Sequence, residues 1–108
     1  MKRHPASAIS ISKELNDLLQ TLGPNHKFSK WIEDMKNVLK EHVFSGEQVK
    51  KNQIPKYYID KHGVNNLYRY RHPEGYRSCY TVVKGYTPRI LDILSHPEYE
   101  KNFGYKTT

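Results

Sequence analysis

The sequence predicts an α+β fold: an N-terminal strand and an antiparallel helix hairpin packed on an antiparallel, curved four-stranded sheet, with a short C-terminal helix. Two patterns predict it. Apolar residues recur at helical spacing through residues 15–22 and again through 28–43. Residues 67–94 instead read as short strands separated by turns that contain glycine or proline. The chain has 108 residues, the size of one domain, so we assign residues 1–108 to a single domain.

The N-terminal part reads as a strand followed by a helix. Residues 6–11 alternate small polar residues with Ile9 and Ile11, which predicts a short strand with one buried face. Ser12 is a suitable N-cap for the helix behind it. The apolar stripe of that helix consists of Leu15, Leu18, Leu19 and Leu22. Gly23 and Pro24 then end it, because glycine adopts the left-handed conformation and proline cannot continue a helix.

A second amphipathic helix follows directly. Its apolar side carries Phe28, Trp31, Ile32, Met35, Val38, Leu39, His42 and Val43, and we expect it to end at Ser45 and Gly46. A connection as short as residues 23–25 predicts that the two helices pack as an antiparallel hairpin. We expect the combined apolar surface of the two helices to pack on a sheet.

Residues 47–66 lack a sustained apolar period. Pro55 suits the start of a short helix through Tyr57, Tyr58 and Ile59, and Gly63 suits its end. The sheet then returns as three strands, at residues 67–71, 76–83 and 89–94, joined by tight turns into an antiparallel meander. Finally, Ser95 and Glu98 have the spacing of a capping box with Pro97 in the first turn, which predicts a helix to about Asn102 that closes at Gly104.

The net charge is concentrated in one segment. The chain carries +7 at pH 7, and residues 50–89 hold nine lysines and arginines against Asp60 and Glu74. Seven of the nine tyrosines lie in the same segment. Guanidinium groups bind phosphate and aromatic rings stack on bases, so the predicted ligand is nucleic acid, and RNA rather than duplex DNA. We assign Lys56 and Lys61 of this segment to RNA binding.

The sequence lacks the residues that several other classes of function require. The single cysteine, Cys79, excludes an internal disulfide and a multi-cysteine zinc site, and we interpret it as a packing residue. The six histidines show no metal-ligand spacing, and no phosphate-binding glycine loop or serine-nucleophile motif is present. No apolar run has the length of a membrane span. We therefore expect a cytoplasmic protein that uses no metal or cofactor and does not contact membranes.

Alternation along the strands predicts a cationic surface. Arg69 and Arg71 point to one face of their strand, and Arg77 joins them from the next strand, whereas the neighbouring tyrosines point to the opposite face. If the helices cover the tyrosine face, the arginines form an open floor that binds phosphate. The alternative is that these arginines only protect exposed strands from aggregation. His96 is the candidate for proton transfer, because imidazole titrates near neutral pH; the alternative is an exposed histidine beside a helix cap.

The order of these elements and three sequences within them resemble the RelE/ParE toxin superfamily. The sequences are NLYRYR at residues 66–71, GYRSCYT at 75–81 and ILDIL at 90–94. The resemblance covers nearly the whole chain and is weakest over residues 47–63. It implies a RelE-like fold and a metal-independent endoribonuclease that cleaves mRNA on the ribosome. It also implies a small antitoxin protein as partner, as in type II toxin–antitoxin systems.

The resemblance also implies roles for individual residues. Arg77 matches the arginine that holds the scissile phosphate, and Arg69 and Arg71 match a pair of basic residues on the preceding strand. His96 matches the position of a catalytic histidine or arginine, and Tyr99 matches a nearby tyrosine that stacks or relays a proton. Two alternatives remain open: a non-catalytic module that binds RNA or DNA, and a ParE-like toxin that inhibits a topoisomerase by protein contact.

Overall fold

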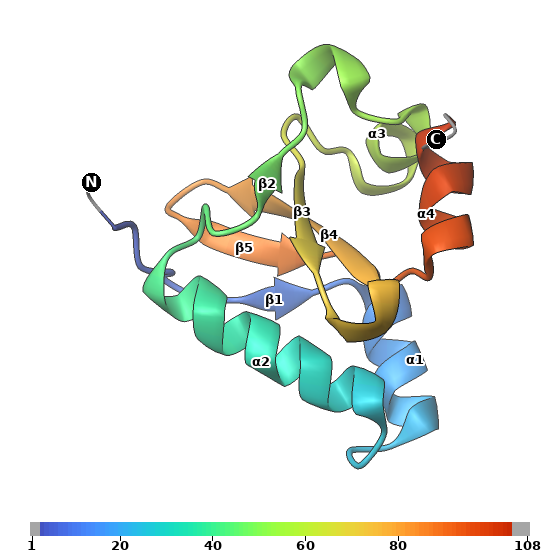
Figure 1. Cartoon of the computed structure of the whole chain (residues 1–108). Coiled ribbons are helices and arrows are strands. Elements are labelled where there is room, and N and C mark those ends of the chain that lie inside the picture. Colours follow the sequence, from blue (N-terminus) through green and yellow to red (C-terminus); the bar gives the residue numbers. More distant parts are fainter. Residues whose placement is uncertain (1–2, 105–108) are drawn as a thin grey trace.

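The computed structural model describes residues 3–104 and contains four α-helices and a five-stranded sheet (Figure 1). The helices are α1 (Lys13–Leu22), α2 (Lys27–Glu41), α3 (Lys56–His62) and α4 (His96–Phe103). The strands are β1 (Ser10–Ile11), β2 (Glu47–Gln48), β3 (Tyr68–Arg71), β4 (Arg77–Val83) and β5 (Thr87–Ile90). Short 3₁₀ turns at Lys51–Gln53 and Pro73–Gly75 complete the structure. The predicted α+β class is confirmed.

The sheet differs from the predicted antiparallel four-stranded one. Its order is β1-β5-β4-β3-β2, and β1 runs parallel to β5 whereas all other pairs are antiparallel. The predicted meander is present as β3, β4 and β5. β2 was not predicted, because its two residues are polar and exposed and carry no alternating pattern. The sheet is therefore mixed and has one more strand than expected.

Three element boundaries also differ from the predictions. The first strand covers only Ser10–Ile11, because the chain before it bonds to other partners: the Ala6 N–H donates to the Lys40 carbonyl. α2 ends at Glu41, since the Val43 N–H donates to the carbonyl of His4. β5 covers Thr87–Ile90 instead of residues 89–94, so it begins two residues earlier and ends four residues earlier than predicted.

The predicted helix boundaries at the other positions are confirmed. Ser12 caps α1 by accepting a hydrogen bond from the Leu15 N–H. α3 follows Pro55 and ends at Gly63 in the left-handed conformation. The Ser95 capping box is complete, and α4 ends at Gly104. These helix ends are fixed by local chemistry, which is why the sequence predicts them.

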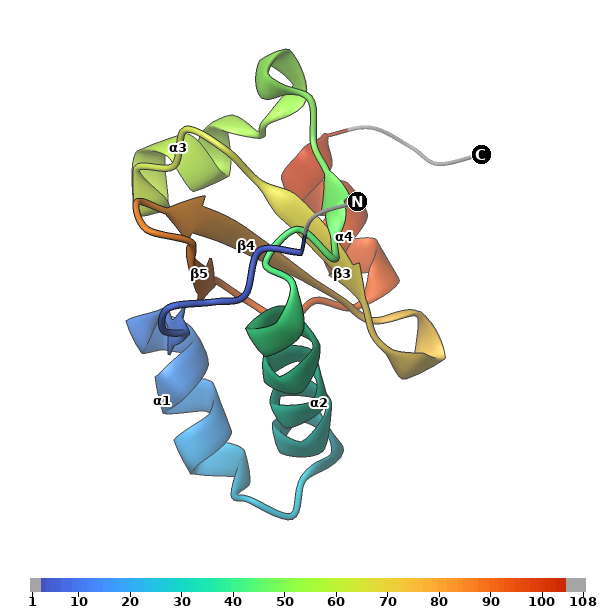
Figure 2. The same ribbon diagram turned by 90° about the vertical axis from the view of Figure 1, so that its left-hand side faces the viewer.

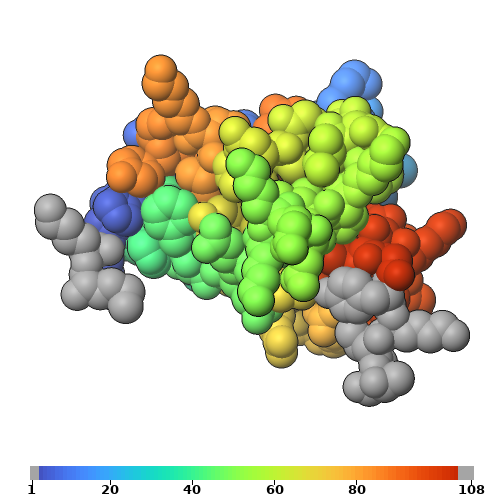
Figure 3. Space-filling view, turned by 90° about the horizontal axis from the view of Figure 1, so that it is seen from above, coloured from blue at the N-terminus to red at the C-terminus, as the bar shows by residue number. Residues whose placement is uncertain are grey.

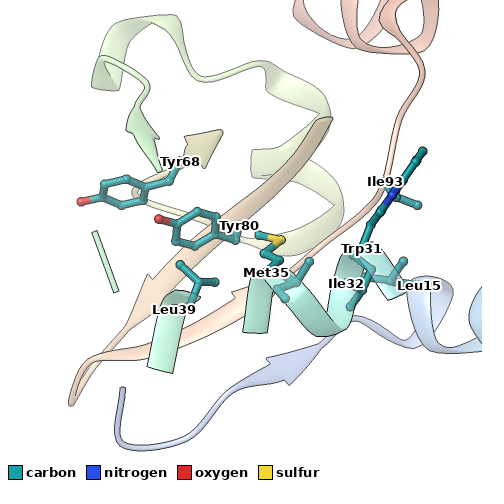
Figure 4. Packing of buried hydrophobic residues seen from close by; sticks show 9 residues of the cluster. Leu15, Trp31, Ile32, Met35, Leu39, Tyr68, Tyr80 and Ile93 are labelled. Carbon is teal, nitrogen blue, oxygen red and sulfur yellow. The ribbon is translucent and has the colours of Figure 1, made fainter. Parts of the chain in front are cut away.

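The helix hairpin covers one face of the sheet, as predicted. Figure 2 shows α1 and α2 side by side on this face. Their apolar residues pack on the tyrosine side chains of the strands, and Figure 4 shows this cluster around Met35 and Tyr80. Its buried members are Leu15, Trp31, Ile32, Met35, Leu39, Tyr68, Tyr80, Ile90 and Ile93.

The opposite face is not open, which corrects the prediction of an uncovered arginine floor. α3 and α4 lie on it and bury a second apolar cluster (Figure 1). This cluster centres on Tyr58 of α3, Tyr99 of α4 and Cys79 of β4. The physical reason is that Cys79 and Leu91 present apolar surface on this side, which the second pair of helices removes from water. Only part of the arginine-bearing face remains accessible.

Candidate functional site

The backbone places the start of α4 beside the start of β4. Arg77 and Leu94 form an antiparallel bridge in which each N–H donates to the other's carbonyl, at 2.9 and 2.7 Å. Ser95 follows at once as the cap of α4, so His96 lies two residues from this bridge. In Figure 1 the chain enters α4 at the end of the sheet where β4 begins. A residue of β4 and the first turn of α4 therefore share one corner of the molecule.

Two arginines converge on one tyrosine at this corner. The Arg77 guanidinium lies over the ring of Tyr99, 4.6 Å from its centroid. Arg69 donates a hydrogen bond from Nη1 to the Tyr99 hydroxyl at 2.6 Å. Tyr99 itself is 1% exposed. Its ring and hydroxyl therefore fix the positions of both guanidinium groups, one by a cation–π contact and one by a hydrogen bond.

β2 supplies the other contact of Arg69. Glu47 accepts from Arg69 Nη2 at 2.8 Å, and the two residues are directly opposite in the β2–β3 ladder. The Arg69 side chain is 25% exposed, so this guanidinium is largely occupied by protein groups. Residues 45–47 and 69–71 line a cavity of about 500 Å³ along this edge of the sheet. Arg69 is thus better suited to organise the site than to bind a ligand alone.

Gly46 allows β2 to approach β3 closely enough for this contact. A Cβ atom there would lie 2.6 Å from the Arg69 carbonyl oxygen and 2.7 Å from the Tyr80 ring. We expect Gly46→Ala to lower the free energy of unfolding by about 1–3 kcal/mol, because buried backbone and a packed ring must move. Urea unfolding measures this, with Gln48→Ala on the exposed side of β2 as the control. Equal stability of the Gly46→Ala and control variants would contradict the close approach.

Arg71 and Arg77 form a pair of like charges. They are direct partners in the β3–β4 ladder, and their side chains leave the same face of the sheet. Neither forms an ion pair with a carboxylate within residues 3–104, and Arg71 is exposed. Like charges at directly opposite positions destabilise a sheet, and a bound anion between them removes that cost. The pair is therefore suited to hold a phosphate.

His96 is oriented by its own helix. Its Nε2 lies 2.6 Å from Oε1 of Glu100, one helical turn further on. A carboxylate at this distance accepts a hydrogen bond, so in this arrangement the proton is on Nε2. The His96 side chain is 43% exposed. His96 and Tyr99 are three residues apart, so they are neighbours on the surface of α4, and the imidazole points toward Glu100.

The structure does not bring Lys56 and Lys61 into this cluster. The Lys56 ammonium group bonds to Asp60 on the same helix at 2.7 Å. Lys61 lies over the Tyr57 ring and 4.0 Å from Glu14 of α1. Both lysines are therefore engaged on α3, whereas Arg69, Arg71, Arg77, Tyr99 and His96 share the corner where β3, β4 and α4 meet.

A buried polar network supports the sheet beneath this corner. Asp92 accepts hydrogen bonds from the Tyr58 hydroxyl at 2.7 Å and from the Cys79 N–H at 2.9 Å. It thereby ties α3 to β4 at the point where the chain after β5 leaves the regular ladder. Burial of the carboxylate raises the pKa of Asp92 to about 6, although the two hydrogen bonds oppose the shift.

This pKa predicts a pH-dependent contribution to stability. The folded state holds the Asp92 proton up to about pH 6 and the unfolded state loses it near pH 3.8, so the contribution is greatest below pH 4 and is lost as pH rises to 6. It amounts to roughly 2–3 kcal/mol. Burial lowers the pKa of His72 to about 4, which acts with the opposite sign over much of this range. The test must therefore compare two proteins.

Asp92→Asn keeps the shape and stays uncharged, and His72 is common to both proteins. We expect the stability difference between wild type and Asp92→Asn to shift by roughly 2–3 kcal/mol in favour of the wild type between pH 7 and pH 4. Urea unfolding at several pH values measures this. A difference that does not change with pH would show that Asp92 titrates normally.

Sequence reasoning missed Glu47, Glu100 and Asp92 as parts of the site and its support. Glu100 had a usable signal, because it lies four residues after His96 in a helix that the capping box predicts. Glu47 had none, since its strand is too short to show a pattern. Asp92 was placed inside a predicted strand, and its bonds to Tyr58 and Cys79 join segments that are distant in the sequence.

Comparisons of the chain with protein-family models, with curated proteins and with solved structures found no match. Within residues 3–104, no three His, Cys, Asp or Glu side chains gather as possible ligands of a metal ion. No helix in the same part of the chain combines the length and apolar composition needed to cross a bilayer.

Proposed function

We propose that this protein is a metal-independent endoribonuclease of the toxin type, which cleaves mRNA on the ribosome. The observation that carries the proposal is the convergence of Arg77 and Arg69 on Tyr99 beside the start of α4, which bears His96. Cations that can hold a phosphate and an imidazole that can move a proton thus share one corner. Cleavage of RNA by its own 2′-hydroxyl requires both.

The reaction begins when the ribose 2′-oxygen attacks the adjacent phosphorus and its proton passes to a base. The bond from phosphorus to the 5′-oxygen of the next nucleotide then breaks, and that oxygen takes up a proton. The products are a 2′,3′-cyclic phosphate and a 5′-hydroxyl end, so the atoms balance without any co-reactant. The protein must move protons and stabilise the negative charge that builds up on the phosphorane.

Arg77 and Arg71 supply the charge stabilisation in this proposal. Neither is neutralised by a carboxylate within residues 3–104, and a phosphate between them would be bound by both guanidinium groups. Arg77 is the more strongly positioned of the two, because its guanidinium is stacked on the buried ring of Tyr99. Preorganised charges of this kind act without reorganisation during the reaction.

His96 is the proton-transfer group, and Glu100 is its positioning residue. The contact with Glu100 holds hydrogen on Nε2, and in that tautomer Nδ1 is the nitrogen that accepts a proton. Tyr99 takes a different role from the one that the resemblance implies. A ring that is 1% exposed and whose hydroxyl accepts from Arg69 is suited to position the arginines, so we assign Tyr99 to positioning and not to proton relay.

The partners proposed for this activity follow from the resemblance to RelE/ParE toxins and from the charge. The net charge of +7 and the arginines suit contact with mRNA and with ribosomal RNA in the cytoplasm. A small antitoxin protein that covers the same arginines with carboxylates would silence the activity.

The experiment is a reconstituted translation reaction with a reporter mRNA, in which the RNA ends are mapped after addition of the purified protein. We expect new mRNA ends and arrested translation, and no effect on a DNA supercoiling reaction. Tight, salt-sensitive RNA binding without new ends would instead indicate a non-catalytic module. Inhibition of the topoisomerase with intact mRNA would indicate a ParE-like toxin.

A further inference from the structure

A cavity of about 830 Å³ lies at the end of β4 remote from Arg77. It opens to solvent and is lined mainly by the segment after α3, the last residues of β4 and the tip of the β4–β5 hairpin. Figure 3 shows the orange β4–β5 hairpin and the yellow-green segment near residues 62–66 on the surface seen from above. Its volume is in the range of pockets that bind small ligands. The cleavage site described above does not use it.

The lining combines aromatic rings with positive charge. Phe44, Tyr68 and Tyr86 supply the rings, and Lys84 and Arg89 supply the cations. No aspartate or glutamate lines the cavity. Within the described residues, neither Lys84 nor Arg89 forms an ion pair, and both are exposed. A ligand that has both a flat ring and a negative charge would satisfy this combination.

Tyr86 is held in an unusual conformation at the mouth of the cavity. Its φ of 57° is in the left-handed region, where a bulky residue is strained and glycine or asparagine is preferred. The N-terminal segment fixes the turn, because Ser7 donates to the carbonyls of both Gly85 and Tyr86. His4 stacks on the Tyr86 ring at 4.6 Å, yet Tyr86 remains 45% exposed. The ring is therefore fixed in place and still accessible.

We infer that this cavity binds a nucleotide, with the base stacked on the face of the Tyr86 ring that His4 does not cover and the phosphate held by Arg89 and Lys84. Phe44 stands at right angles to Tyr86 and would contact the edge of the base. Base–aromatic stacking accepts any base, and the cations recognise the phosphate. The nucleotide is either free or part of a single-stranded RNA. This inference goes beyond the cleavage reaction and does not depend on it, because the cavity shares none of Arg71, Arg77 or His96.

The test is a titration of the full-length protein with each probe. Binding is monitored through the NMR chemical shifts of the backbone amides. The probes are adenosine 5′-monophosphate, adenosine, inorganic phosphate and a single-stranded oligoadenylate. We expect saturable shifts at the lining residues with the monophosphate, and weaker binding of adenosine or phosphate alone. Tyr86→Asn removes the ring but tolerates the backbone conformation, and should weaken binding about tenfold. Arg89→Gln should weaken it by a similar factor.

The matched controls are Tyr57→Asn, which removes an exposed ring on α3, and Lys30→Gln, which removes an exposed charge on α2. Both should bind the probes as the wild type does. If only the oligoadenylate binds and both cavity variants weaken it, the ligand is a nucleotide within a strand. The inference would be overturned if no probe shifted the lining residues. It would also be overturned if both cavity variants bound the nucleotide probes with wild-type affinity.

The outcome is separable from that of the cleavage proposal. Arg77→Ala should retain nucleotide binding in the cavity whether or not the protein cleaves mRNA. Loss of cavity binding in Arg77→Ala, in a variant whose amide spectrum shows an intact fold, would contradict the independence of the two sites.

Discussion

Replacing Arg77 with alanine is expected to slow mRNA cleavage by about 10²–10³-fold, the effect of removing one preorganised charge from a transition state. The guanidinium lies on the ring of the buried Tyr99, directly across the ladder from Arg71, and has no carboxylate partner within residues 3–104. It is therefore positioned before substrate arrives. The measurement is the rate of appearance of mapped mRNA ends in the translation reaction, at saturating protein.

Two further variants serve as comparisons for Arg77→Ala. Arg77→Lys keeps the charge but loses the planar fork, and should fall between wild type and alanine. Arg3→Ala removes an exposed arginine that contacts Glu41 on α2, and should cleave at the wild-type rate. Urea unfolding of each variant excludes a loss of fold. Wild-type cleavage by a folded Arg77→Ala would reject Arg77 as the charge-stabilising residue.

Replacing His96 with glutamine should slow cleavage by about 10²–10⁴-fold, the range for loss of a general acid or base. Glutamine retains a hydrogen-bonding side chain at the start of α4 but does not titrate. The measurement is the rate of appearance of mapped mRNA ends in the translation reaction. His26→Asn is the matched control, since asparagine preserves the N-cap that His26 provides to α2.

Glu100→Gln separates positioning from chemistry. Glutamine at this position still reaches Nε2 of His96 but lacks the charge of the carboxylate. We expect a smaller loss of rate than with His96→Gln, because the imidazole keeps a hydrogen-bond partner but loses the anionic one. Wild-type cleavage rates in both His96→Gln and Glu100→Gln would assign proton transfer to another group.

Local chemistry explains which parts of the fold could be predicted. The caps at Ser12 and Ser95 and the end of α3 at Gly63 depend only on neighbouring residues, and all three are present. The alternation of tyrosine and arginine along β3 also placed the tyrosines beneath α1 and α2, as expected. The spacing of apolar residues and the capping of helices depend on short segments. Both can therefore be recognised in a single sequence.

Contacts between segments that are distant in the sequence explain where the predicted sheet and site differ from the structure. β1 pairs in parallel with β5 across most of the chain, and β2 consists of two polar residues whose position depends on Gly46. α4 was predicted, but not that it would pack over the arginine face and bury Tyr99. The sequence therefore pointed to Arg77, Tyr99 and His96 as candidates, whereas their environment, including Glu47, required the structure.

The most direct test of the central claim is the chemistry of the RNA ends that the wild-type protein produces. Attack by the 2′-hydroxyl predicts fragments that end in a 2′,3′-cyclic phosphate and begin with a 5′-hydroxyl, and predicts that both disappear with Arg77→Ala and with His96→Gln. Fragments with 3′-hydroxyl and 5′-phosphate ends, or cyclic phosphate ends that persist in both folded variants, would contradict the assignment of RNA cleavage to the corner formed by β3, β4 and α4.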